Sequence, residues 1–234
     1  MTNKTLDFYQ VYYEKEQRQE FYDFAIPYLN IELTPYFENS VLRSLVVNST
    51  ADFVSICSWK LRRKRNAMPT IYVLKENALT LNKEIILSKD FDVAILTPRL
   101  AGHKTLFMSK HWHGQAWIES FSSLSSFLET KLKIEVPSEL KYAIYENHFI
   151  AKKDIYLEYV LSCLTPVMEY MEENKSIFEV PSGYRKHKER LGDFVSIEKY
   201  EETTKLKDWP IGVFLLERLF SIWIDSRNYA VVNI

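Results

Sequence analysis

The segment ADFVSICSWKLRRK, residues 51–64, joins a short apolar run to a cluster of cations. Its first part, from Asp52 to Cys57, predicts a short buried strand. A second apolar run, DVAIL from Asp92 to Leu96, predicts another strand, closed by Thr97 and Pro98. Because helical stretches separate such strands, we expect an α/β layered fold with a central, mostly parallel sheet flanked by helices.

Six further segments extend this pattern. Each is assigned by its hydrophobic period, by its aromatic content or by a proline at a helix start. Proline inside a helical pattern predicts a kink, because it lacks the backbone N–H. We expect an opening strand from Leu6 to Tyr13, helices after Thr34, from Phe121 to Leu132, from Asp154 to Glu173 with a kink at Pro166, and from Trp209 to Ile224, and an extended segment from Tyr142 to Ile150.

Composition limits the class of protein. The 234 residues suit one domain, residues 1–234, and 14 Phe, 15 Tyr and 5 Trp are too many aromatic residues for a disordered chain. The stretch from Ser182 to Thr204 is polar and is expected to be a mobile loop rather than a linker. Lys plus Arg total 30 and Asp plus Glu total 31, and this balance argues against a nucleic-acid partner.

Cysteine usage and hydropathy point to a reducing, cytoplasmic compartment. Cys57 and Cys163 each lie in an apolar run, which favours buried thiols over a disulfide framework. The first residues lack the pattern of a signal peptide, and no run of about 18 apolar residues occurs. We therefore expect no integral membrane insertion, while peripheral attachment to the inner membrane stays open.

The basic loop from Ser58 to Arg65 follows the DFVSIC strand directly. In open α/β sheets, ligands collect at the carboxyl ends of the strands. Lys60 and Arg62, with Trp59 available for stacking, therefore suit a diphosphate or another anion. Two alternatives stay open, a solvated basic loop and a nucleic-acid patch.

Two pairs of side chains are candidate ligands for a divalent metal such as Mn²⁺ or Mg²⁺. Asp90 and Asp92 form an Asp-x-Asp pair, but they precede their apolar run and so fall at the amino end of the expected strand. His111 and His113 alternate, yet no third ligand follows them at a familiar spacing. A polar loop at the histidines is favoured, and no cofactor is assigned.

Two polar groups lie beside buried runs. The segment KYAIYENHF places the carboxylate of Glu146, the amide of Asn147 and the imidazole of His148 beside a buried run, and Asn147 or His148 could bind sugar hydroxyls or cap the backbone locally. Glu217 lies within the apolar helix PIGVFLLERLFSIWI, so its carboxylate must be paired or must line a cavity. It is either half of an internal salt bridge or a catalytic carboxylate.

Three segments belong together: FYQVYY (8–13), PYFENSVLRSLV (35–46) and ADFVSICSWKLRRK (51–64). In combination they resemble a family of bacterial polysaccharide-biosynthesis proteins. The later pair YENHFIAKKDIYLEYVLSCLTPVMEYME (145–172) and FLLERLFSIWI (214–224) is similar to the C-terminal half of capsular-polysaccharide glycosyltransferases. The resemblance implies a GT-A-like fold and a transfer of a sugar from a nucleotide-diphosphate donor to an acceptor hydroxyl.

The resemblance also implies site residues. Tyr9, Gln10 and Tyr12 would line the nucleotide pocket. Ser58, Trp59 and Lys60 stand where the family commonly carries an Asp-x-Asp metal motif, so cations replace carboxylates and Lys60 and Arg62 would neutralise the leaving diphosphate. The groups near the donor sugar or the acceptor would be Asn147, His148 and Glu217, with Glu217 as the first candidate base and His113 as the second.

The implied partners are a nucleotide-diphosphate sugar and a glycan or lipid-linked acceptor. A rival interpretation is a non-catalytic protein that keeps the fold and binds a glycan or a nucleotide sugar, because a fold does not guarantee a chemistry. Loss of the usual metal carboxylates favours this rival. A nucleic-acid binder would instead show strongly salt-dependent binding.

Overall fold

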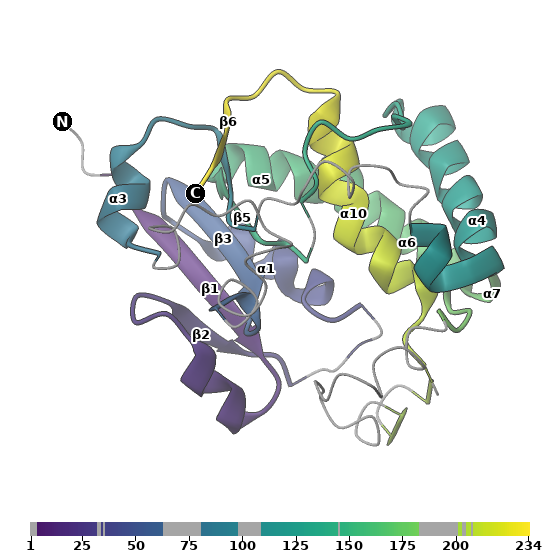
Figure 1. Cartoon of the computed structure of the whole chain (residues 1–234), viewed down its shortest axis with the longest axis horizontal. Helices are drawn as coiled ribbons and strands as arrows, with labels where there is room; N and C mark the ends of the chain where they lie inside the picture. Colours follow the sequence, from purple (N-terminus) through teal and green to yellow (C-terminus); the bar gives the residue numbers. More distant parts are fainter. Residues whose placement is uncertain are drawn as a thin grey trace.

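The computed structural model describes residues 4–31, 34, 36–62, 81–97, 109–144, 146–182, 201–202, 205–206 and 208–234, and for residues 109–113 it describes the backbone alone. These residues form a mixed α/β fold in which helices flank a twisted sheet (Figure 1). Helices α4, α6, α7 and α10 gather beside the sheet, on the side away from β1 and β2 in Figure 1.

The described residues contribute six strands to one sheet, in the order β2-β1-β3-β5-β4-β6. β1 pairs in parallel with β2 and β3, and β4 pairs in parallel with β6. β5 lies between β3 and β4 and is antiparallel to both, so the sheet is mostly parallel with one reversed central strand. The strands are β1 (Leu6–Tyr12), β2 (Ile26–Leu29), β3 (Phe53–Ser58), β4 (Val93–Ile95), β5 (Phe149–Lys152) and β6 (Val231–Asn233).

The helices that surround the sheet are mostly short. A 3-10 helix, η1 (Lys15–Glu20), follows β1, and two turns have π geometry, η5 (Leu128–Leu132) and η6 (Val160–Leu164). The α-helices are α1 (Asn39–Asn48), α3 (Lys83–Ser88), α4 (Ser109–Phe127), α5 (Lys153–Tyr159), α6 (Thr165–Glu173), α7 (Lys175–Phe178) and α10 (Ile211–Asp225).

Apolar side chains cover both faces of the sheet. On one face, Val54 and Ile56 of β3 are buried with residues of α1, α5 and α10. The ring of Phe149 in β5 stacks on Phe220 of α10, with centroids 3.7 Å apart. On the other face, Phe8, Cys57 and Ile86 belong to a second buried cluster. Burial on both faces explains why the central strands read as apolar runs.

The helical stretch predicted from Asp154 to Glu173 is present but interrupted. The π turn η6 separates α5 from α6 and ends just before Thr165 and Pro166. Since Pro166 cannot donate an i→i−4 hydrogen bond, a local departure from α geometry there has a plain cause. Cys163 of this turn is buried, and neither it nor Cys57 forms a disulfide.

The predictions for β1, β3, β4, α1, α10 and the helix at 121–132 are confirmed. The extended segment predicted from Tyr142 to Ile150 is wrong in its bounds, because β5 begins only at Phe149. Glu146 and Asn147 have φ of 60° and 55°, values incompatible with a strand. The loop predicted at 182–204 lies outside the described residues except for Ser182, Glu201 and Glu202.

Within the described ranges, no helix is both long and apolar enough to cross a membrane.

Candidate functional site

One edge of the sheet gathers most of the polar residues that the sequence singles out. The parallel strands β1, β3 and β4 end there, and the antiparallel β5 begins there. The reversed direction of β5 therefore brings Asn147 and His148 to the edge where Ser58 ends β3 and Thr97 follows β4. We call this edge, with these four residues, the carboxyl edge.

The basic loop leaves the carboxyl edge at the end of β3. Ser58 and Trp59 are buried, and the N–H of Trp59 donates to the carbonyl oxygen of Val11 at 3.0 Å. The ammonium of Lys60 lies 5.4 Å from the centre of the Trp59 ring, a cation–π distance. The backbone thus fixes where the loop starts, and Lys60 stands beside an indole.

Arg62 is exposed and contacts the segment between η1 and β2. Its Nη1 donates to the carbonyl oxygen of Phe21 at 3.0 Å, and its guanidinium lies 5.8 Å from the centre of the Tyr22 ring. Because a guanidinium has five N–H donors, one bond to a carbonyl leaves capacity for an anion. Lys60 and Arg62 therefore supply two cations beside the carboxyl edge.

Asn147 is held from two sides. Its Nδ2 donates to Oδ1 of Asn39, the first residue of α1, at 3.2 Å, and its carbonyl oxygen accepts from the Cys57 thiol at 3.4 Å. Both asparagines are 4% exposed. Sequence reasoning missed Asn39, because a polar residue at a helix start reads as a cap.

His148 is fully buried between two polar neighbours. Its Nδ1 lies 3.3 Å from Oγ1 of Thr97 and 3.6 Å from Oε2 of Glu146. Glu146 belongs to the same sequence motif as His148 but was assigned no role there. The structure thus adds Thr97, Glu146 and Asn39 to the residues gathered at or beside the carboxyl edge.

The three candidate residues of β1 do not share one surface. Tyr9 is half-buried on the same side as Asp7, whose Oδ2 lies 3.5 Å from its hydroxyl, and burial and then Asp7 raise the pKa of Tyr9. Gln10 points to the opposite face, where its Oε1 accepts from the N–H of Tyr22 at 2.7 Å. Tyr12 ends the strand at the carboxyl edge, so it is the one of the three that borders the loop residues.

The two candidate bases lie on helices rather than at a strand end. Glu217, in α10, has Oε2 4.0 Å from Nη1 of Arg218, whose guanidinium stands 4.7 Å from the Trp117 ring of α4. The Glu217 side chain is 24% exposed, so it occupies a half-buried position where α10 meets α4. His113 belongs to the start of α4, and its side chain lies outside the described residues.

The Asp-x-Asp pair weighed for a metal is engaged in other contacts. Oδ1 of Asp92 is 2.7 Å from Nζ of Lys152, and its Oδ2 accepts from the N–H of Ala230 at 2.8 Å. These bonds lower the pKa of Asp92, the Lys152 bond most. Within the part of the chain that the structure describes, no group of three or more His, Cys, Asp or Glu side chains is placed to hold a metal ion.

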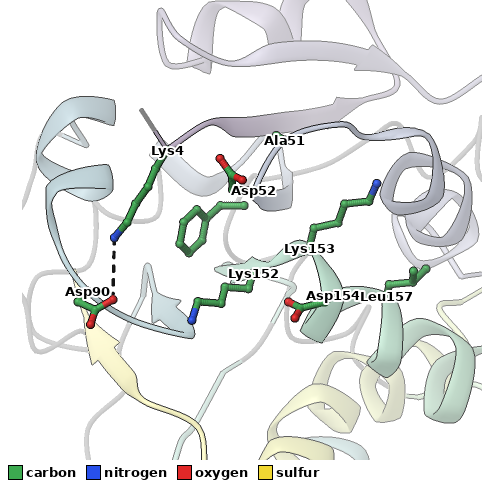
Figure 2. A pocket seen from close by; sticks show the side chains of 9 residues that line it. Lys4, Ala51, Asp52, Asp90, Lys152, Lys153, Asp154 and Leu157 are labelled. Carbon is green, nitrogen blue, oxygen red and sulfur yellow. Dashed lines mark ion pairs between the residues drawn. The ribbon is translucent and has the colours of Figure 1, made fainter. Parts of the chain in front are cut away.

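A hollow of about 640 Å³ opens at the opposite edge, where β1 and β3 begin and β5 ends (Figure 2). We call it the amino edge. Its charged lining residues include both lysines and aspartates, and Nζ of Lys4 lies 3.9 Å from Oδ1 of Asp90. The residues that line it are Lys4, Ala51, Asp52, Phe53, Asp90, Lys152, Lys153, Asp154 and Leu157.

The fold and these contacts define a mixed α/β protein with a polar, partly cationic candidate site at the carboxyl edge of its sheet. No protein-family model matches the sequence, and no curated protein matches it. Among solved structures, the chain is similar to WbbM, a bifunctional glycosyltransferase in its apo form, with a TM-score of 0.49 and 16% sequence identity. That match covers 97% of this chain and 44% of WbbM, so the chain spans less than half of that protein.

Proposed function

We propose that the protein is a glycosyltransferase that binds a nucleotide-diphosphate sugar at the carboxyl edge and transfers the sugar to an acceptor hydroxyl. The observation that carries this proposal is the convergence of Ser58, Trp59 and Lys60 with Asn147 and His148 at one sheet edge. In open α/β sheets this edge is where ligands bind. The sequence resemblance supplies the polysaccharide context, with a glycan or a lipid-linked glycan as the acceptor.

In this proposal the cations act on the leaving group. The bond between the anomeric carbon and the diphosphate oxygen breaks, the bond from the acceptor oxygen to that carbon forms, and the acceptor proton passes to a base. Lys60 and Arg62 stabilise the negative charge that grows on the diphosphate. Glu217 stays the first candidate for the base, with His113 second.

Thermal unfolding against a panel of nucleotide diphosphates and nucleotide sugars, with and without Mn²⁺, tests donor binding. A ligand at about 100 times its Kd stabilises the native state by roughly 2.7 kcal/mol. We expect one nucleotide sugar to shift the transition without metal, and Lys60→Ala to reduce that shift to about half or less. If no member of the panel shifts a well-folded sample, the proposal is wrong.

A non-catalytic binding protein is the second candidate, and one contact favours it. The Glu217 carboxylate lies 4.0 Å from the Arg218 guanidinium, an ion-pair distance that fits the internal salt bridge weighed against a catalytic carboxylate in the sequence. Release of nucleotide diphosphate in the presence of acceptor glycans separates the two candidates. If Glu217→Gln binds the donor but lowers turnover at least a hundredfold, Glu217 is the base, whereas a wild-type rate would reject that assignment.

A further inference from the structure

Five residues other than glycine have positive φ in the described ranges: Phe37 (49°), Lys133 (57°), Glu146 (60°), Asn147 (55°) and Lys205 (62°). Lys133 has a local explanation, because it ends the π turn η5 and its N–H donates to the carbonyl oxygen of Leu128. Lys205 follows the helical residues 201–202, and its N–H donates to the carbonyl oxygen of Glu201 at 2.9 Å. The other three gather around one contact.

That contact is the hydrogen bond from Nδ2 of Asn147 to Oδ1 of Asn39. Asn39 stands two residues after Phe37, and its Nδ2 donates to the carbonyl oxygen of Tyr36 at 3.2 Å. The two sides of the contact are far apart in sequence, 108 residues, yet both carry left-handed backbone. The Asn39–Asn147 hydrogen bond therefore joins the turn at Phe37 to the turn at Glu146 and Asn147.

Such backbone is costly. A left-handed conformation is less costly for asparagine than for other side chains, so Glu146 carries the larger penalty of the adjacent pair. Strained backbone persists only where surrounding contacts hold it, and it concentrates at ligand sites. Here the holding contacts are the Asn39 amide, the Cys57 thiol on the Asn147 carbonyl, and His148 beside Glu146.

The strained turn aims a carboxylate at the carboxyl edge. Oε2 of Glu146 is buried and lies 3.6 Å from Nδ1 of His148, next to Thr97 at the end of β4. The Glu146 side chain is 19% exposed, and with Oε2 buried this exposure belongs to the rest of the side chain. A carboxylate accepts hydrogen bonds at both oxygens, which suits the hydroxyl groups of a sugar.

We propose that Glu146 is a further ligand-binding residue of the carboxyl edge, which accepts hydrogen bonds from hydroxyl groups of the donor sugar. Asn39, Asn147 and His148 are positioning residues for it. The inference rests on the proposed function and deepens it, since it separates the part of the site that holds the sugar from the cations that hold the diphosphate.

The test compares two ligands on the whole chain by titration calorimetry. The ligands are the nucleotide sugar that gives the largest shift in the panel and its parent nucleotide diphosphate. Glu146→Gln is nearly isosteric, and we expect it to weaken nucleotide-sugar binding roughly tenfold or more while leaving nucleotide-diphosphate binding within about twofold. Glu129→Gln, an exposed glutamate of η5, is the matched control and should change neither affinity.

Equal loss of both affinities, or no loss of either, would overturn the role of Glu146 and leave the proposed function standing. Failure of the wild-type protein to bind either ligand would overturn both proposals. Should Glu146→Gln not fold, Glu146→Asp keeps the charge beside His148 and withdraws the carboxylate by one methylene. That variant is then expected to show the same selective loss for the nucleotide sugar, and equal affinities would again reject the role.

Discussion

The two edges of the sheet differ in how they use charge and space. The amino edge has the hollow, but its groups are exposed and mixed in sign, and Asp92 and Lys152 satisfy each other beside it. The carboxyl edge instead has buried polar side chains held by backbone groups, and a strained turn. Among the described residues, the hollow and the buried polar side chains therefore lie at opposite ends of the same strands.

One strand creates this difference. Because β5 runs antiparallel to β3 and β4, its first residues reach the carboxyl edge and its last residue, Lys152, reaches the amino edge. Asn147 and His148 precede it, and Lys153 follows it. The direction of the four-residue strand β5 therefore decides which side chains lie beside the end of β3.

The largest effect is expected from breaking β5 itself. Phe149 is fully buried and stacks on Phe220, so Phe149→Ala should lower the free energy of unfolding by about 3–5 kcal/mol. Urea denaturation measures this loss, and nucleotide binding should weaken with it. Leu161→Ala, at a 47% exposed position, serves as the control and should cost less than about 0.5 kcal/mol. A similar cost for both variants would contradict the role given to β5.

The second largest effect is expected on nucleotide-diphosphate affinity when one lysine is removed from each edge in turn. Lys60→Ala should weaken nucleotide-diphosphate binding roughly tenfold or more, because it removes a charged donor beside the carboxyl edge. Lys153→Ala removes a lysine at the amino edge, whose Nζ donates to the carbonyl oxygen of Ser49, and should leave that affinity within twofold. Calorimetric titration of both variants decides it, and the reverse order of effects would move the site to the hollow.

A third, smaller effect concerns pH at the amino edge. Lys152 and the N–H of Ala230 lower the pKa of Asp92, and Asp92 raises the pKa of Lys152. The depressed carboxyl pKa contributes stability above the unfolded value, about 3.9, and loses it as pH falls through the folded value. The raised lysine pKa contributes stability below its unfolded value, about 10.4, and loses it as pH rises through the folded one.

Asp92→Asn removes this linkage. Because the pair is partly exposed, the variant should lose no more than about 1 kcal/mol at pH 7. The difference from wild type should shrink as pH falls below about 4, and urea midpoints measured between pH 2 and pH 7 would show it. A difference that stays constant down to pH 2 would mean that the pair contributes nothing through titration.

The smallest effect is expected at the rim of the hollow. Lys4 lies 3.9 Å from the almost fully exposed Asp90, a weak surface pair. Lys4→Ala should therefore change the melting temperature little and leave nucleotide binding unchanged. A clear loss of nucleotide affinity in this variant would show that the amino edge takes part in ligand binding.

The sequence predicts the central strands well because they are buried on both faces. Phe53–Ser58 and Val93–Ile95 read as short apolar runs for that reason. The edge strand β2 was not predicted, because it is mostly exposed and contains Pro27, so its pattern carries little signal. The direction of β5 could not be predicted either, since strand polarity depends on pairing between residues far apart in sequence.

The candidate site was predictable only in part. Lys60 and Arg62 stand out as a charged run after a strand, and Asn147 and His148 as polar residues before one. Asn39 carries no such signal, because its importance comes from a contact with a residue 108 positions away. Glu146 stands in the predicted motif, but its positive φ and its approach to His148 could not be predicted. The opposite orientation of Tyr9 and Gln10 follows from the alternation of side chains along the predicted strand, but the apolar cluster that each face meets is visible only in the structure.

Hydrogen–deuterium exchange with and without the strongest-binding nucleotide sugar shows which edge of the sheet binds the ligand, because it reports both edges in one experiment. If the carboxyl edge is the binding site, the ligand slows exchange in peptides covering residues 57–62 and 146–149 and leaves residues 51–54 and 152–154 unchanged. Protection at 51–54 and 152–154 without any at 57–62 would place the ligand in the hollow and reject the carboxyl edge as the site.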